Sequence, residues 1–224
     1  MSIHTYWMSL SSAEATLILV KETETNNLFT AHLHGLTRKE LVQTVAKGLY
    51  REKRFGHQTS SEVSVAEHSL WLGSWLKAMI PEVADYGYLH DTPESVFHDT
   101  CKMLKTDETC VMEDAIYEAM DWGVPHPKGD ALGAFKFWDS VASAAEGELF
   151  GYAWPWLKTY RNRFGSGNID AYKQHILQYQ GNTVDGNIQR MWELAARGIL
   201  LKRKKLLSHI FRAPKKILNS ITHG

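Results

Sequence analysis

The chain has 224 residues, of which 44% are hydrophobic and 22% charged, and its formal net charge is zero. This length and composition predict one soluble globular domain with a substantial core, and they exclude a disordered or fibrous protein. No apolar run reaches the roughly 18 residues of a membrane span. No basic residue precedes the short apolar stretch at 16–20, so a secretory signal is not expected.

The charge is unevenly distributed along the chain. Seven basic and no acidic residues follow Arg197, which leaves 18 basic and 25 acidic residues before that point, a net charge of about −7. The body is therefore acidic and the tail, 198–224, is basic. The two cysteines, Cys101 and Cys110, lack CxxC spacing. A disulfide framework is not expected, and a reducing cytoplasm is the favoured location.

The first predicted element is a β-hairpin over 14–33, where two short β-prone runs flank a polar turn. The pattern then becomes helical. Capping-box spacing, a Ser or Thr followed three residues later by Glu, opens helices expected over 37–49 and 64–79. A third helix, 81–90, begins with a proline, which suits a first helical turn.

A new helix is expected directly after Asp91, with Thr92 as its cap and Pro93 at its first position. Asp130 is the predicted cap of a later helix that contains Asp139. The segment 151–168 is rich in aromatic residues and is expected to be irregular. The remaining helices are predicted over 107–122, 130–149, 169–180 and 186–206.

Histidines and carboxylates are concentrated within ten residues that contain His90, Asp91, Glu94, His98 and Asp99. Consecutive helical residues do not share a face, so His90 and Asp91 reach one ion only if the helix end points into a site. A solvated acidic helix face explains the carboxylates but not two histidines between apolar residues. A bare His-Asp pair is more often a cap or a surface pair; its surroundings here favour a metal site.

Two histidines and two aspartates, His68, His90, Asp91 and Asp139, form a mixed nitrogen and oxygen set. Such a set suits Mn, Fe, Co, Ni or Zn better than an ion that prefers oxygen alone. Four protein ligands on an octahedral ion leave two positions for water and a phosphate oxygen. The ion would then polarise phosphorus and lower the pKa of water.

Three motifs carry a resemblance to a known family: RFGH at 54–57, SVAEHS at 64–69 and HDTPE at 90–94, followed by Asp99 and Lys102. Together they resemble the HD-domain phosphohydrolases, helical metalloenzymes with an H…HD…D ligand set. Within that family they are similar to the bacterial 5′-deoxynucleotidases. They are also similar to phage HD-domain deoxynucleotide hydrolases, including dATP triphosphohydrolases.

The expected fold is mainly α, an HD-domain helical bundle with a small N-terminal β-hairpin. Residues 1–150 would form the phosphohydrolase domain, the motif resemblance covering roughly 36–150. Residues 151–224 would form a helical extension packed on the same domain. The basic tail is most simply interpreted as a solvated helix end with a packing helix. Contact with another subunit, with nucleic acid or with a membrane surface is the alternative.

The resemblance also implies roles for individual residues. It makes Glu94 the carboxylate that transfers protons and Asp99 a residue that positions the substrate. Its metal ligands are His68, His90, Asp91 and Asp139. Its candidate substrate-binding residues are Arg54 and Lys102 at the phosphate, Phe55, which replaces the usual tryptophan of the bacterial enzymes, and His57.

Alternatives stay open for several of these residues. Arg54 and Lys102 are equally compatible with ordinary surface charges, and His57 with a loop histidine of no metal role. His98 is interpreted as structural or as a support for the ligands. Glu146, seven residues after Asp139, is interpreted as a packing or salt-bridge residue, with a place in the site as the less favoured alternative.

The implied function is metal-dependent hydrolysis of phosphate from deoxynucleotides. A 5′-deoxynucleotidase is favoured over a triphosphohydrolase because a triphosphate needs several basic residues. A signalling phosphodiesterase and a non-catalytic nucleotide-binding HD protein are further alternatives. The implied cofactor is a divalent transition metal (Co, Mn, Zn, Fe or Ni), with Mg²⁺ as a candidate second ion. A homo-oligomer in the cytoplasm of a bacterium or a phage-infected host is expected.

Overall fold

The computed structural model describes most of the chain after residue 35 and is mainly helical, with no strand in its described part. The chain divides into two compact units, Met1–Leu41 and Val42–Gly224. The predicted hairpin at 14–33 lies outside the described residues. These residues are 36–57, 62–97, 106–152, 156–181 and 187–212.

Of the first unit, the structure describes the start of helix α3 (Arg38–Arg51). Thr37 and Glu40 form the predicted capping box. The Thr37 N–H donates to Glu40 Oε2 at 2.8 Å, and the Glu40 N–H donates to Thr37 Oγ1 at 3.3 Å. These two bonds satisfy backbone donors that a helix N-terminus otherwise leaves without partners. The sequence prediction for this helix start is therefore confirmed.

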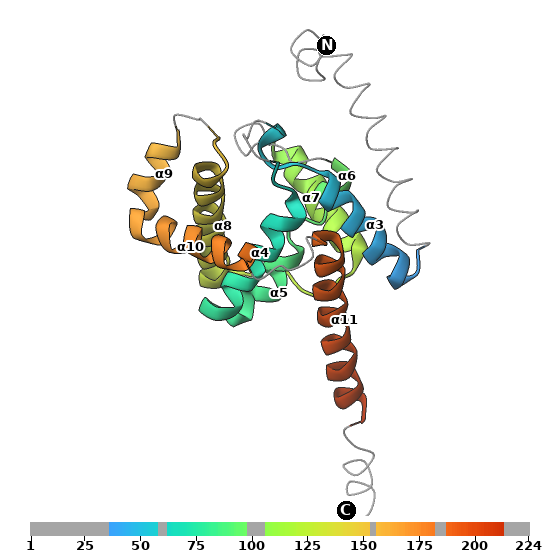
Figure 1. Ribbon diagram of the computed structural model, residues 1–224. Coiled ribbons are helices and arrows are strands. Elements are labelled where there is room, and N and C mark those ends of the chain that lie inside the picture. The colour runs from blue at the N-terminus through green and yellow to red at the C-terminus, as the bar shows by residue number, and fades with distance from the viewer. Residues whose placement is uncertain (1–35, 58–61, 98–105, 153–155, 182–186, 213–224) are drawn as a thin grey trace, which may run out of the picture. The chain divides into compact units, whose positions relative to one another are not determined.

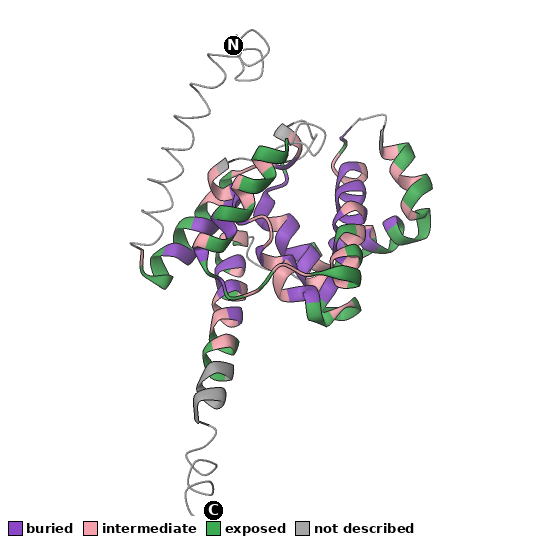
Figure 2. Cartoon of the chain, turned by 180° about the vertical axis from the view of Figure 1, so that it is seen from behind, coloured by how far each residue is buried: buried purple, intermediate pink, exposed green. Residues whose placement is uncertain are grey.

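The second unit is built around helix α4, which contacts α5, α8, α10 and α11. Figure 1 shows these helices, and Figure 2 shows that the buried residues line their inner faces. The elements are the 3₁₀ turn η1 (Arg54–His57) and the helices α4 (Val65–Met79), α5 (Pro81–Leu89), α6 (Glu94–Phe97), α7 (Asp107–Met120), α8 (Gly129–Leu149), α9 (Trp156–Phe164), α10 (Ser166–Gly181) and α11 (Ile188–Arg212).

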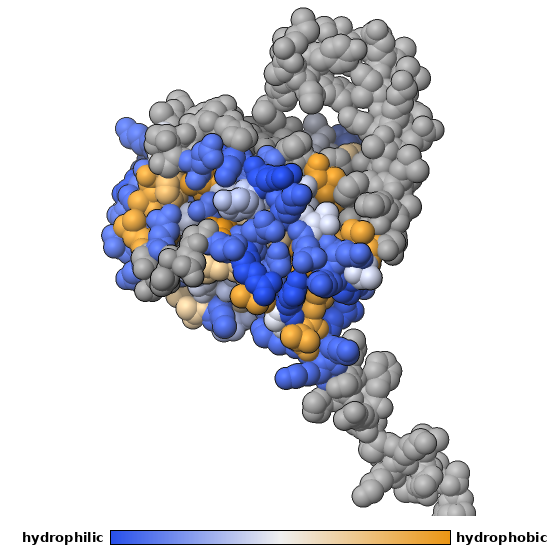
Figure 3. All heavy atoms as spheres, turned by 45° about the vertical axis from the view of Figure 1, so that its right-hand side comes forward, coloured by the Kyte–Doolittle hydropathy of each residue, from blue (hydrophilic) through white to orange (hydrophobic). Residues whose placement is uncertain are grey.

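The core lies between α4, α8 and α10. Trp71 and Leu72 of α4 and Tyr172 of α10 are at most 1% exposed, and burial of each such side chain contributes about 1.5–3 kcal/mol. Most exposed residues on the face drawn in Figure 3 are hydrophilic, with hydrophobic residues scattered among them. Among the described helices, none has the length and apolar character needed to cross a membrane.

Two glycines bring α4 and α5 close together. A Cβ atom at Gly73 would lie 2.4–2.6 Å from ring atoms of Tyr88, and one at Gly87 would lie 2.7 Å from Leu76 Cδ1. Only a residue without a side chain fits at this separation. Because α4 carries His68 and α5 ends at His90, this close approach helps to set the distance between the two histidines.

Several predicted helix boundaries are wrong. Residues 156–164 form helix α9, although the segment was expected to be irregular. Helix α8 begins one residue before Asp130, with Lys128 at the N-cap and no side-chain capping bond. The Thr92 hydroxyl donates to Leu89 O at 2.7 Å instead of capping α6. By contrast, the capping box of α4 is present as predicted, with Ser64 and Glu67 bonded in both directions.

Helix α9 is held against α8 and α10 by ion pairs that sequence periodicity does not encode. Arg161 Nε lies 2.7 Å from Glu148 Oε1 on α8. Lys173 Nζ of α10 lies 3.0 Å from Glu148 Oε2, so the same carboxylate also links α8 to α10. A further bond joins Arg161 Nη2 to Asp170 Oδ1 at 2.6 Å. These tertiary contacts explain why a segment without clear helical signals in its sequence becomes a helix.

Glu148→Gln is expected to destabilise the protein at neutral pH but not in acid. The hydrogen bond from Arg161 holds the pKa of Glu148 below its ordinary value of 4.5, and Lys173 acts in the same direction, against the effect of burial. A carboxylate with a lowered pKa stabilises the fold above its unfolded pKa and loses that contribution as the pH falls through its folded pKa. Thermal unfolding of both proteins from pH 7 to 3 should show the difference in Tm closing below pH 4.5. A difference that stays constant would contradict this account.

Candidate metal centre

The four predicted metal ligands come together in space from three parts of the chain. His68 Nε2, on α4, lies 3.4 Å from Asp139 Oδ1, on α8, and 3.5 Å from Asp91 Oδ2. His90 Nε2, at the end of α5, lies 2.9 Å from Asp91 Oδ1 and 3.9 Å from Asp139 Oδ1. The ligand atoms of His68, His90 and Asp139 all lie within 4.8 Å of one another, an arrangement that could hold a metal ion.

The end of α5 is fixed by a turn that aims His90 and Asp91 at the same point. His90 is the C-cap of α5, and its N–H donates to Tyr86 O at 2.8 Å. The buried Thr92 hydroxyl donates to Leu89 O and accepts from Trp122 Nε1 at 3.0 Å. The expectation that a helix end must point into the site therefore agrees with the geometry.

Both histidine rings are turned so that Nε2 faces the two aspartates. His90 Nδ1 donates to Gly87 O at 3.0 Å, and His68 Nδ1 lies 2.7 Å from Glu146 Oε1. A carbonyl oxygen only accepts hydrogen bonds, so His90 Nδ1 carries its proton and Nε2 keeps the lone pair. His68 Nδ1 is likewise taken up by the Glu146 carboxylate, so Nε2 is the ring nitrogen that a metal would reach. Histidines that bind metals are usually oriented in this way by a bond from the second ring nitrogen.

The donor set fits a divalent transition metal. His68 Nε2, His90 Nε2 and Asp91 Oδ2 are buried atoms without a hydrogen-bond partner. Leaving a buried polar atom unsatisfied costs about 1–3 kcal/mol, so three such atoms around one point favour a site that binds a cation. Two imidazole nitrogens and two carboxylates suit Zn, Mn, Fe, Co or Ni.

The charges of the cluster favour a cation. Burial and the charge of Arg54 lower the pKa of His68, but the charge of Glu146 and the carboxylates of Asp139 and Glu146, which accept from the protonated ring, outweigh them and raise it to about 9. Burial opposes ionisation of Asp91, yet the neighbouring His90, His68 and Arg54 hold the pKa of its carboxyl well below the usual range. The site therefore keeps its carboxylate charged despite burial.

Arg54 lies beside the cluster. Its Nη1 is 3.8 Å from Asp91 Oδ2, its Nη2 donates to Ser143 Oγ at 3.1 Å, and its Nε is 3.4 Å from Glu146 Oε2. Its side chain is only 7% exposed, so an ordinary surface charge is the wrong interpretation. Much of the guanidinium faces α8.

Glu146 is fully buried and contacts both Arg54 and His68. The expectation of a salt bridge is confirmed, and the less favoured alternative, contact with the site, holds as well. Ser143 was missed by the sequence analysis. Asp139, Ser143 and Glu146 share one face of α8 by their helical spacing, which is the signal that connects them.

The structure describes some of the remaining predicted site residues, and the others lie outside the described residues. Glu94 is 4% exposed, and its N–H donates to Asp91 O at 2.9 Å. Phe55 has a φ of +58° and stacks on Tyr152 with ring centroids 4.5 Å apart. The backbone of His57 belongs to η1, and its side chain is not described. His98, Asp99 and Lys102 fall outside the described residues.

Tyr172 was not predicted to lie near the site. Its hydroxyl is buried without a hydrogen-bond partner. Burial, together with the charges of Glu146 and Asp139, raises its pKa well above the ordinary value. Tyr172 comes from α10, far from any motif, so no pattern in the sequence could have connected it with Asp139.

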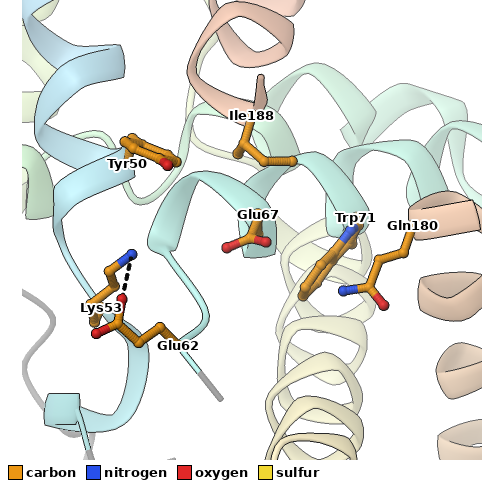
Figure 4. A pocket seen from close by; sticks show the side chains of 7 residues that line it. All are labelled: Tyr50, Lys53, Glu62, Glu67, Trp71, Gln180 and Ile188. Carbon is orange, nitrogen blue, oxygen red and sulfur yellow. Dashed lines mark ion pairs between the residues drawn. The ribbon is translucent and has the colours of Figure 1, made fainter. Parts of the chain in front are cut away.

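A separate pocket of about 380 Å³ contains none of the predicted metal ligands. Figure 4 shows its lining side chains. Lys53 Nζ pairs with Glu62 Oε2 at 3.4 Å, and Glu67 is bonded within the capping box of α4. Since these charged groups already have partners, the pocket is a weaker candidate than the cluster. Its lining residues are Tyr50, Lys53, Glu62, Glu67, Trp71, Gln180 and Ile188.

Comparison of the chain with family models, with curated proteins and with solved structures returned no match.

Proposed function

We propose that the chain is a metal-dependent phosphohydrolase that releases phosphate from deoxynucleoside 5′-monophosphates. The observation that supports it is a pair of histidines, the buried His68 of α4 and the partly buried His90 at the C-cap of α5. Each is turned by a bond at Nδ1 so that Nε2 faces Asp91 and Asp139. When bound, a divalent metal would supply Lewis-acid polarisation of the phosphoryl group and a water of lowered pKa.

The residues around the cluster have chemistry that suits a phosphate ester. Arg54 brings a guanidinium next to the ligands, and such a group is well suited to offset phosphate charge. Glu94 is a buried carboxylate joined through its backbone to Asp91, and it is the proposed group for proton transfer. Among the described residues, Arg54 is the basic group paired with a proposed ligand, and a single guanidinium suits a monophosphate better than a triphosphate.

A panel of substrates tests the proposal. Full-length protein with Mn²⁺ or Co²⁺ is incubated with dNMPs, dNTPs, NMPs and cyclic nucleotides, and the products are identified by chromatography. Inorganic phosphate and a deoxynucleoside from dNMPs are expected. Triphosphate released from dNTPs would replace the monophosphatase by a triphosphohydrolase. Cleavage of cyclic nucleotides alone would point to a phosphodiesterase, and no turnover with any metal would overturn the enzyme proposal.

Glu94→Gln is expected to slow hydrolysis by about 10²–10⁴-fold, the usual contribution of a general acid or base, while leaving the metal affinity unchanged. The substitution keeps the size of the side chain and removes its ability to exchange a proton. Steady-state kinetics and a metal titration on the same preparation separate the two effects. Glu193→Gln is the matched control, because Glu193 is a buried glutamate on α11 paired with Arg190 and Arg197. Equal rates for Glu94→Gln and the wild type would remove Glu94 from the mechanism.

A further inference from the structure

We propose that Glu146 is a positioning residue for the metal centre, and that Arg54 acts as its buried counter-ion. The proposal rests on the metal site of the proposed function, and it assigns a task to a carboxylate that the ligand set does not use. Glu146 lies on α8, seven residues after Asp139. Helix α8 therefore supplies both a ligand and a support for a second ligand, His68.

The ring of His68 is held from both sides by α8. Its Nδ1 is 2.7 Å from Glu146 Oε1, and its Nε2 is 3.4 Å from Asp139 Oδ1. His68 and Glu146 are both 0% exposed, so neither side chain has water to bond with instead. An imidazole can rotate or change tautomer, and a strong acceptor at Nδ1 suppresses both changes. Glu146 therefore holds Nε2 in the direction of the cluster.

The charge of Arg54 offsets the cost of burying the Glu146 carboxylate. A buried charge is strongly destabilising without a partner, and Arg54 Nε lies 3.4 Å from Glu146 Oε2. Ser143, one turn earlier on α8, accepts from Arg54 Nη2 and fixes the guanidinium plane.

A purely structural ion pair is the competing explanation, and the two make different predictions for the histidine ring. His90 provides an internal control, because its Nδ1 is held by the Gly87 carbonyl and not by a carboxylate. Loss of Glu146 should therefore disturb His68 and leave His90 unchanged. A loss of stability alone would change the unfolding temperature without changing the coordination of one particular ring.

The experiment uses full-length protein, a Zn²⁺ competition titration and long-range ¹H–¹⁵N spectra of the histidine rings. Glu146→Ala is expected to lower zinc affinity about 10–100-fold, the usual effect of losing such a support. It should also change the His68 ring signals but not those of His90. Glu146→Gln keeps an acceptor for Nδ1, so its loss of affinity should be smaller. Glu148→Ala, two residues further along α8 in a surface ion pair, should bind zinc like the wild type.

Each outcome bears on a separate claim. Wild-type zinc affinity and unchanged His68 signals in Glu146→Ala would overturn the positioning role while leaving the metal site intact. Wild-type protein that binds no zinc would overturn the metal site and this proposal with it. If Glu146→Ala does not fold, Glu146→Gln decides: an unchanged affinity together with an unchanged Nδ1 proton signal of His68 would overturn the proposal.

Discussion

Replacing His90 with alanine is expected to reduce the affinity for Co²⁺ or Mn²⁺ by more than about 100-fold, since loss of a ligand should exceed the 10–100-fold effect of losing a residue that supports one. Phosphate release should disappear with the metal. The His90 ring is held by Gly87 O, with Nε2 directed at Asp91, so its removal leaves a gap in the ligand set without removing either carboxylate. Calorimetric titration and the visible spectrum of bound Co²⁺ measure the loss.

His175→Ala is the matched control for this variant. His175 is half-buried on α10, and its Nε2 bonds to Trp71 O at 3.1 Å, within the aromatic core and outside the ligand set. Its replacement should leave one metal ion bound with near wild-type affinity, whatever its effect on the unfolding temperature. Equal affinities for the His90→Ala and wild-type proteins would place the metal elsewhere and contradict the assignment of the cluster.

Gly73→Ala is expected to destabilise the protein by about 1–3 kcal/mol, although alanine normally favours a helix over glycine. The new Cβ would lie 2.4–2.6 Å from ring atoms of Tyr88, so α4 and α5 would have to separate or the ring would have to move. For a chain of this size, each kcal/mol corresponds to a fall in Tm of about 2–4 °C. Because these two helices carry His68 and His90, metal affinity should fall as well.

Gly133→Ala separates packing from helix propensity. Gly133 lies within α8 with nothing within 4 Å of an added Cβ, so alanine there should stabilise the fold by about 0.5–1 kcal/mol. Thermal or urea unfolding of the two variants beside the wild type measures both effects. A Gly73→Ala protein as stable as Gly133→Ala would show that α4 and α5 are not closely packed at this point.

Local sequence signals predicted the starts of α3, α4 and α5 correctly. Ser64 and Glu67 form the expected capping box, and Pro81 occupies the first turn of α5. These features depend on residues within three or four positions of one another, so a single sequence contains all the information they need. The same holds for the adjacency of His90 and Asp91, which marked a site at a helix end.

Tertiary contacts account for what the sequence did not predict. Helix α9 is fixed by Arg161, which pairs with Glu148 and Asp170 from the two neighbouring helices. Thr92 resembles a helix cap in the sequence, but Trp122, thirty residues away, donates to its hydroxyl. Partners so far apart in the sequence cannot be predicted from it, because no local pattern connects them.

The candidate site also combines local signals with tertiary contacts. Its four proposed ligands could be named from sequence motifs, but the residues that bond to those ligands could not be identified from the sequence. Arg54 was expected to bind phosphate or to be a surface charge, but its Nε and Nη2 face Glu146 and Ser143. Glu146 was expected chiefly to pack or form a salt bridge, yet it also bonds His68. The contacts of the His68 ring with Glu146 and Asp139 depend on how α4 and α8 pack, which the sequence does not reveal.

The most direct test of the central claim is the rate of phosphate release from a dNMP as a chelator-stripped protein is titrated with Co²⁺. The stripped protein should release no phosphate. The rate should then rise in proportion to bound metal and reach a plateau at one ion per chain, bound by the cluster of His68, His90, Asp91 and Asp139. A fully loaded protein that releases no phosphate, or a stripped protein that releases it at the full rate, would contradict the account.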